Sequence, residues 1–203
     1  VIIVFIGYHE WSSTGIITGN PPSGWDYAEP HMSMYNDDGT FGGVAVEGFK
    51  DGPSGKPVST SFYKVQGASV DTTFAFGFRW ECALVAAAFR NVDVSNPPDS
   101  IFDDGSYSQG QGLSLDPSSV TTSAACAIVT FACVTGDYSQ IDISGPSGYD
   151  DFDTKKMTMS NDNNSVGFAW TLQSNAGTED PPAFTQTQGT YKYSTTAVGL
   201  KPA

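Results

Sequence analysis

Residues 146–150, Pro-Ser-Gly-Tyr-Asp, repeat the pattern Pro-Ser-Gly-Trp-Asp of residues 22–26. Each copy follows an apolar run, at residues 1–6 and at residues 127–132. Phe5 lies 17 positions before the proline that opens its copy, and the corresponding phenylalanine of the second run lies 15 positions before the other copy. Repeated strand–loop–turn units are typical of a β-fold built from two similar halves. The repeat therefore predicts a scaffold more directly than a site.

The composition favours β-structure. The chain has 203 residues, which is enough for one domain with a sizeable core. Charged residues make up only 15%, whereas helices use more Glu, Lys and Arg on their exposed faces. Twenty-two glycines suit short strands joined by many turns, and an aromatic share of 13% argues against disorder.

The net charge of −13 excludes some partners. Nucleic-acid phosphates require a basic surface, so nucleic-acid binding is not expected. Binding to an anionic bilayer is disfavoured for the same reason. An acidic surface is typical of a protein that faces water, and a cationic partner remains the sharper alternative.

Alternating side chains predict several strands. Residues 166–172 place Val, Phe, Trp and Leu on one face, which predicts a half-buried strand. Residues 74–78 form a second one-sided stripe, and we expect a hairpin with residues 61–65 through the turn at 67–69.

Other runs are apolar on both faces and predict central strands. These are residues 80–89, whose alanines also suit a buried helix, and residues 127–134. Residues 190–200 predict a closing strand, and residues 91–117 form the longest polar stretch. No linker separates domains, so we expect one domain over residues 1–203.

We expect the halves of this domain to span about residues 1–93 and 118–203. The chain opens on Val1 inside a strand-like run, and we expect a preceding segment to be missing from the front.

The order of several segments resembles the jelly-roll-like β-sandwich domains of tailed-phage virion structural proteins. Each motif alone is a weak signal, but their shared order is more specific and covers nearly the whole chain. The motifs are the two Pro-Ser-Gly-aromatic turns, Phe-Tyr-Lys-Val at 62–65, Thr-Thr-Phe-Ala-Phe at 72–76, Ala-Ala-Ala-Phe-Arg-Asn-Val-Asp at 86–93 and Ala-Val-Gly-Leu-Lys-Pro-Ala at 197–203.

This resemblance implies an all-β, antiparallel jelly-roll-like sandwich with two similar halves. It implies a non-enzymatic, surface-exposed virion protein, such as a capsid decoration, tail or fibre subunit, that assembles with itself or with capsid or tail proteins. A carbohydrate-binding adhesin for host attachment is the alternative, and a glycan-degrading enzyme ranks third. No catalytic residue, cofactor or metal ligand carries over from the family.

Three aromatic residues are candidates for contact with a ligand or partner. Trp11, Trp25 and Tyr27 lie in or near predicted loops. Exposed aromatic rings stack on sugars or pack against a neighbouring subunit. Packing beneath a loop is the alternative role for all three.

Candidate catalytic groups are few. Glycosidases require two carboxylates facing one cleft. Glu81 lies in a predicted strand, where Arg79 or Arg90 would form an ion pair with it, and a catalytic acid is the less favoured role. His9 beside Glu10 would suit acid–base chemistry, but no nucleophile accompanies the pair.

Metal sites and disulfides are also not favoured. A site made by His9, His31 and Glu29 is conceivable, and the acidic turns at 37–38, 103–104 and 150–153 would suit Ca²⁺, but Asp favours turns intrinsically. The cysteines lie in no CxxC motif, and we expect buried free thiols. They are Cys82, Cys126 and Cys133.

Overall fold

The structure is a computed structural model with an all-β architecture. It describes residues 1–10, 24–27, 34–35, 41–42, 56–67, 73, 82–94, 102–136, 142–158, 163–187 and 192–203. These residues form strands, all paired antiparallel, and no helix. The predicted all-β class is therefore confirmed for the described part of the chain.

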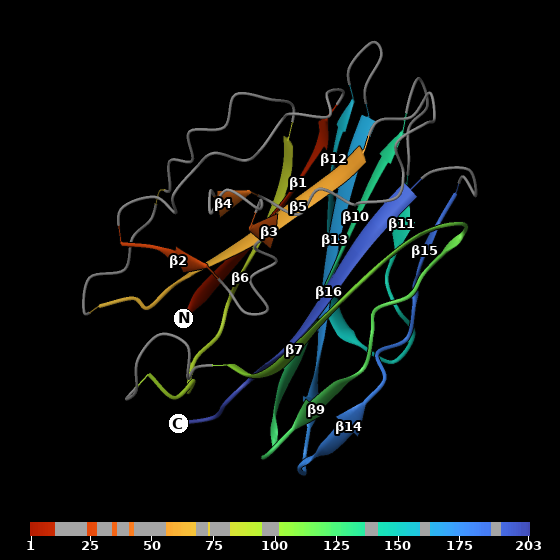
Figure 1. Cartoon of the computed structure of the whole chain (residues 1–203). Coiled ribbons are helices and arrows are strands. Elements are labelled where there is room, and N and C mark those ends of the chain that lie inside the picture. The colour runs from red at the N-terminus through yellow and green to blue at the C-terminus, as the bar shows by residue number, and fades with distance from the viewer. Residues whose placement is uncertain are drawn as a thin grey trace.

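Two large sheets make up most of the structure (Figure 1). The first has the order β2-β5-β1-β6, with β2 (Asp26–Tyr27), β5 (Lys56–Lys64), β1 (Ile2–Glu10) and β6 (Cys82–Ala88). The second has the order β12-β13-β10-β16-β7, with β12 (Asp150–Thr158), β13 (Asn163–Gln173), β10 (Cys126–Gly136), β16 (Lys192–Leu200) and β7 (Phe102–Gln111).

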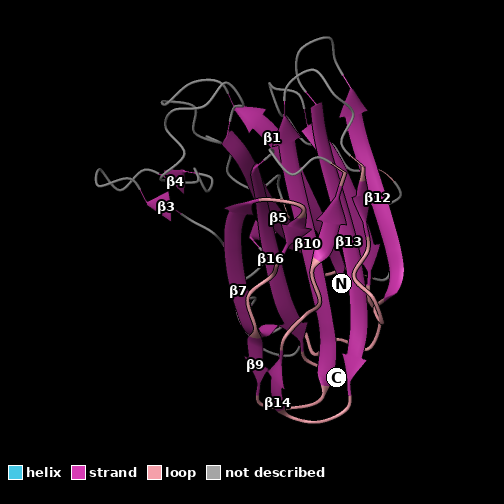
Figure 2. Ribbon diagram, turned by 90° about the vertical axis from the view of Figure 1, so that its right-hand side faces the viewer, coloured by secondary structure: helices cyan, strands magenta, loops and turns pink. Residues whose placement is uncertain are grey.

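Short strands form three smaller sheets. One has the order β11-β15-β8, with β11 (Ile143–Ser144), β15 (Phe184–Gln186) and β8 (Ser114–Leu115). The others pair β14 (Gly177–Glu179) with β9 (Val120–Thr122), and β3 (Met34–Tyr35) with β4 (Phe41–Gly42). Figure 2 places β9 and β14 together at one end of the long strands.

The two large sheets pack face to face through aromatic and aliphatic side chains. The rings of Phe5 on β1 and Phe131 on β10 stack with centroids 4.8 Å apart and an interplanar angle of 20°. Phe168 on β13 lies 6.1 Å from Phe131. Offset aromatic pairs contribute beyond the area that they bury. The same core contains Ile3, Tyr63, Ala83, Val85, Val129, Cys133, Val166, Val198 and Leu200.

The two sheets share one strand order. The order β2-β5-β1-β6 is repeated as β12-β13-β10-β16. In both sheets the chain forms the third strand of this order first, then the first strand, then the second and finally the fourth. The register agrees as well, because equivalent residues pair across three neighbouring strands. The paired sets are Ile3, Tyr63 and Asp26 in the first sheet, and Val129, Trp170 and Asp150 in the second.

The repeated turn adopts one conformation in both sheets. Gly24 has φ of 81° and Gly148 has φ of 80°, in the left-handed region that favours glycine. In each copy the aromatic residue follows, and the strand then begins at Asp26 or Asp150. The turn thus positions β2 and β12, which occupy equivalent places in the two sheets.

A third layer covers the far side of the second sheet. Ala132, Ala169 and Tyr193 of this sheet pack on Leu115 and Phe184 of the small sheet β11-β15-β8. Strand β10 is therefore buried on both faces, as its apolar run predicts. The prediction that residues 166–172 form a half-buried strand is wrong in its burial. With the third layer in place, residues 164–169 are buried on both faces of the strand.

Other strand predictions need correction. Within run 80–89, residues Cys82–Ala88 form strand β6, but β6 lies at the end of the order of described strands and is not central. The expected hairpin partner at 74–78 lies outside the described residues, and at Phe62 both edges of β5 are already paired, with β1 and β2. The polar stretch 91–117 contains β7, which the sequence did not predict.

Close packing between the sheets depends on Gly7. A Cβ atom at this position would lie 2.3 Å from Cys133 Sγ and 2.5 Å from Val166 Cγ1. We expect Gly7→Ala to lower the free energy of unfolding by about 2 kcal/mol or more. The added methyl group would push the sheets apart or force the neighbouring side chains into strained conformations. Urea unfolding measures the change.

The matched control is Gly67→Ala, since a methyl group there meets no atom within 4 Å. Adding Cys133→Ala should restore part of the loss in Gly7→Ala. Equal stability of Gly7→Ala and Gly67→Ala would contradict the packing described here.

The repeated turns give a second prediction. Gly24→Ala and Gly148→Ala should each cost about 1 kcal/mol, because both residues have left-handed φ and a Cβ at either meets no atom closer than ordinary contact. Asn at either position should cost less than Ala. Urea unfolding of the four variants checks the pattern, and a loss at only one of the two turns would show that they are not equivalent.

Candidate functional site

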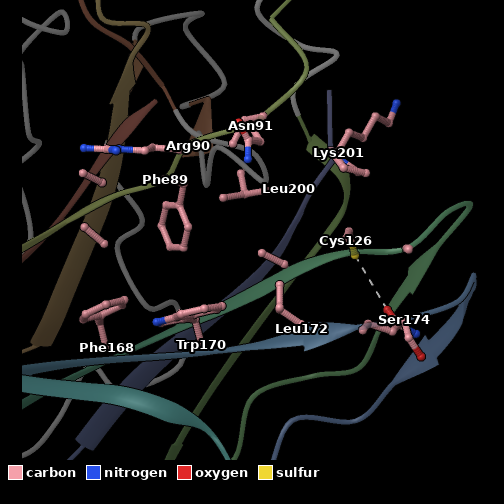
Figure 3. Close-up of a pocket in the computed structure, with 17 residues that line it drawn as sticks. Phe89, Arg90, Asn91, Cys126, Phe168, Trp170, Leu172, Ser174, Leu200 and Lys201 are labelled. Carbon is pink, nitrogen blue, oxygen red and sulfur yellow. Dashed lines mark hydrogen bonds between the residues drawn. The ribbon is translucent and has the colours of Figure 1, made fainter.

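An open pocket of about 750 Å³ lies at one end of the sandwich (Figure 3). Segment 87–92, which includes the end of β6, and segment 200–202, which includes the end of β16, form one wall. The other wall is the end of β13, with Trp170, Leu172 and Gln173. Residues 125–127, where β10 begins, complete the lining.

Backbone hydrogen bonds hold the first wall in place. The amino group of Val1 donates to the carbonyl of Phe89, and the Phe89 N–H donates to the carbonyl of Val1, both at 2.8 Å. The segments that follow β6 and β16 then run antiparallel to each other. Their contacts are Asp93 N–H to Lys201 O at 3.0 Å, Ala203 N–H to Asn91 O at 2.8 Å and a bridge between Val92 and Pro202.

Two aromatic rings shape the apolar part of the pocket. The ring of Phe89 lies 6.0 Å from that of Trp170, at an interplanar angle of 90°. Figure 3 shows the Phe89 ring standing with its edge toward the indole. Leu172 lies nearby with 71% of its surface exposed, which is high for a leucine. The pocket thus offers an apolar surface that a ligand would cover.

The polar rim carries positive charge. Arg90 and Lys201 line the pocket, and none of the described residues that line it carries a carboxylate. Figure 3 shows the two side chains at opposite sides of the pocket, with Arg90 extending to the left and Lys201 to the upper right. In a chain of net charge −13, these two lining residues make the rim locally cationic. A guanidinium group presents a planar fork that fits a carboxylate.

Gln173 links the pocket to the neighbouring strands. Its Oε1 accepts hydrogen bonds from Thr122 Oγ1 at 3.0 Å and from Cys126 Sγ at 3.7 Å. These contacts orient the amide at the end of β13. The Cys126 thiol is therefore both buried and hydrogen-bonded.

None of the three predicted contact residues is among the described residues that line this pocket. Trp25 is buried with 7% of its surface exposed, which favours the packing role that the sequence left open. The backbone of Tyr27 lies in β2, and its side chain is outside the description. Trp11 lies outside the described residues.

The candidate catalytic residues also fall at several places. His9 and Glu10 end strand β1, where they pair with Pro57 and Lys56. Arg90, expected beside Glu81, lines the pocket. Outside the described residues lie Glu29, His31, Glu47, Arg79 and Glu81.

Glu179 has a structural contact. Its Oε1 accepts a hydrogen bond from the Tyr149 hydroxyl at 3.1 Å. Burial, together with the charge of Glu179, raises the pKa of Tyr149 above its ordinary value of 10.0. This contact joins the second repeated turn to β14.

The remaining expectations concern metals and thiols. Cys126 and Cys133 are buried free thiols, as predicted, while the side chain of Cys82 is not described. The acidic segment 150–153 lies in β12, where Asp153 forms an ion pair with Lys155 at 2.8 Å. Among the described residues, no three His, Cys, Asp or Glu side chains gather in a way that would hold a metal ion.

Comparison with known proteins adds no relative. No family model matches this chain, no curated protein matches it, and no solved structure matches it. Within the part of the chain that the structure describes, no helix has the length and apolar character needed to cross a membrane.

Sequence reasoning missed the pocket itself. Phe89, Trp170 and Lys201 are far apart in the sequence, and each reads as part of a strand or as a terminal residue. Only the pairing of the segments after β6 and β16 brings them together. The usable signal was the Phe-Arg pair that ends an uncharged strand.

The Tyr149–Glu179 contact predicts a dependence of stability on pH. Because the folded state raises the pKa of Tyr149, this group stabilises the fold fully below pH 10, and the contribution declines as the pH rises further. Tyr149→Phe should lower the free energy of unfolding at pH 8 by about 1 kcal/mol through the lost hydrogen bond.

Above pH 10, a further rise in pH should lower the free energy of unfolding less in Tyr149→Phe than in the native chain. Urea unfolding at several pH values up to 11 makes the comparison. Parallel curves for the two proteins would contradict this assignment.

Proposed function

We propose that this chain is a non-enzymatic structural protein of a phage particle, exposed on the virion surface and assembling with itself or with capsid or tail proteins. The virion role comes from the sequence resemblance. The jelly-roll strand order that the resemblance implies stays a prediction. In the described part of the chain, the strands of the first large sheet all end by Ala88, and those of the second all begin after it.

The structural role rests on one observation: most described strands belong to sheets that pack against one another. Two large sheets and a third layer contain twelve of the sixteen described strands. Buried polar groups serve the same end. Thr130 Oγ1 donates to Ala169 O at 3.3 Å, and Thr195 Oγ1 donates to Asp116 O at 3.2 Å, which joins strands and layers. A scaffold of this kind suits a building block.

Mass spectrometry of purified particles tests the virion role. Peptides of this chain should remain with intact particles through density-gradient purification, in a constant ratio to the major capsid protein. Brief protease treatment of intact particles should cleave a surface-exposed protein before internal ones. Particles without the chain would rule the role out.

The pocket favours a second candidate function, the binding of an acidic glycan. Aromatic and aliphatic side chains offer a surface for a sugar ring, and the cationic rim suits a carboxylate on that ring. This is the adhesin alternative with a different binding site. The residues concerned are Phe89, Arg90, Trp170, Leu172 and Lys201.

A fluorescence titration tests glycan binding. Oligosaccharides of a polyuronate should change the tryptophan emission in a saturable way, whereas neutral oligosaccharides of equal length should not. Replacing Arg90 and Lys201 together by Gln should raise the Kd several-fold, because the charge that attracts the carboxylate is removed.

The matched control replaces Lys155 and Lys156 by Gln, which removes the same charge from β12. This pair should bind as the native chain does. Equal weakening by both pairs would mean general attraction to the protein, and the pocket would then be discarded as the site.

A further inference from the structure

The strand order of the two sheets differs at one edge. In the second sheet, β7 pairs along the outer edge of β16, from Lys192 opposite Gln111 to Leu200 opposite Phe102. Strand β6 is the counterpart of β16 in the first sheet. It pairs with β1 on one side, and no described strand pairs with its other side.

The hydrogen-bond pattern shows which groups of β6 face away from β1, toward the edge where no described strand pairs. Val1 and Phe89 exchange two hydrogen bonds, and antiparallel pairs of this kind alternate along the ladder. Ala87, which pairs with Ile3, therefore directs its N–H and C=O toward β1. Ala86 and Ala88 direct theirs outward, and both residues are exposed.

The edge strands β12 and β6 differ in their protection against pairing with another chain. Strand β12, at an edge of the second sheet, carries exposed Asp153, Lys155 and Lys156, and its register shifts between Asp150 and Asp153. Charges and irregular register are the usual protection of an edge strand. Residues 82–88 carry no charge, and three of them in succession are alanines. The β6 edge is thus left suited to pairing.

We propose that the β6 edge is an interface at which a second copy of this chain pairs through its own β6. The two strands run antiparallel about a twofold axis at Ala86, so that Leu84 lies opposite Ala88 of the other copy. In this register the outward N–H and C=O groups of both strands match. The small side chains allow close approach, and the first sheet becomes continuous across the dimer.

This inference rests on strand pairing and names a surface for the self-assembly that the proposed function includes, but its test does not require the virion role. A dimer in solution would support it even if the chain were absent from particles. Sedimentation velocity over a range of concentrations should show a monomer–dimer equilibrium for the native chain.

Two substitutions at Ala86 separate edge pairing from folding. Ala86→Pro removes an outward N–H and leaves the ladder to β1 intact, so dimer formation should weaken by roughly tenfold or more, since two hydrogen bonds are lost by symmetry. Ala86→Ser keeps the N–H and should dimerise as the native chain does. Urea unfolding should show similar monomer stability for both.

A cysteine pair gives the geometry of the interface. Hydrogen-bonded residues opposite each other in antiparallel strands have Cα atoms about 5.5 Å apart, within the range of a disulfide. In a Cys82→Ser background, Ala86→Cys should form a covalent dimer under mild oxidation. Ala124→Cys, at another exposed alanine, should remain monomeric.

Three results would overturn the proposal. They are a native chain that is monomeric at every concentration, a dimer that Ala86→Pro leaves unchanged, and equal cross-linking of the two cysteine variants. A dimer that persists in Ala86→Pro would be formed by another surface.

Discussion

The contact between Phe5 and Phe131 is the point on which the described structure depends. The two rings come from equivalent strands and stack at 4.8 Å, so each half of the chain supplies the partner of the other. Around them, neither large sheet has a complete core of its own, because the buried cluster takes residues from both. The repeat therefore exists as a pair of sheets that share one buried cluster.

The close approach of the sheets follows from the same arrangement. Gly7 and Cys133 are paired across the core as Phe5 and Phe131 are, and the absence of a side chain on one makes room for the thiol on the other. The two halves have thus become complementary at this position. A cysteine at both places would not allow this approach, because even a Cβ atom at residue 7 would lie 2.3 Å from Cys133 Sγ.

Sequence patterns predicted the parts of this fold that depend on local chemistry. The apolar run of β10 and the glycine turns could be read directly, since burial and left-handed φ each demand particular residues. Strand β7 could not, because Gly, Ser, Gln and Asp dominate it and its place comes from pairing with β16. The pocket depends on contact between Asn91 and Ala203, far apart in the chain, and no local pattern carries that information.

The division of the strands between the sheets has a consequence for synthesis of the protein. All described strands of the first sheet are complete by Ala88, whereas the second sheet closes only with β16, at the C-terminal end. A ribosome therefore releases the first apolar face well before the strand that completes its cover has been made. During that interval the nascent chain exposes an apolar surface that includes Phe5, and such transient exposure favours aggregation.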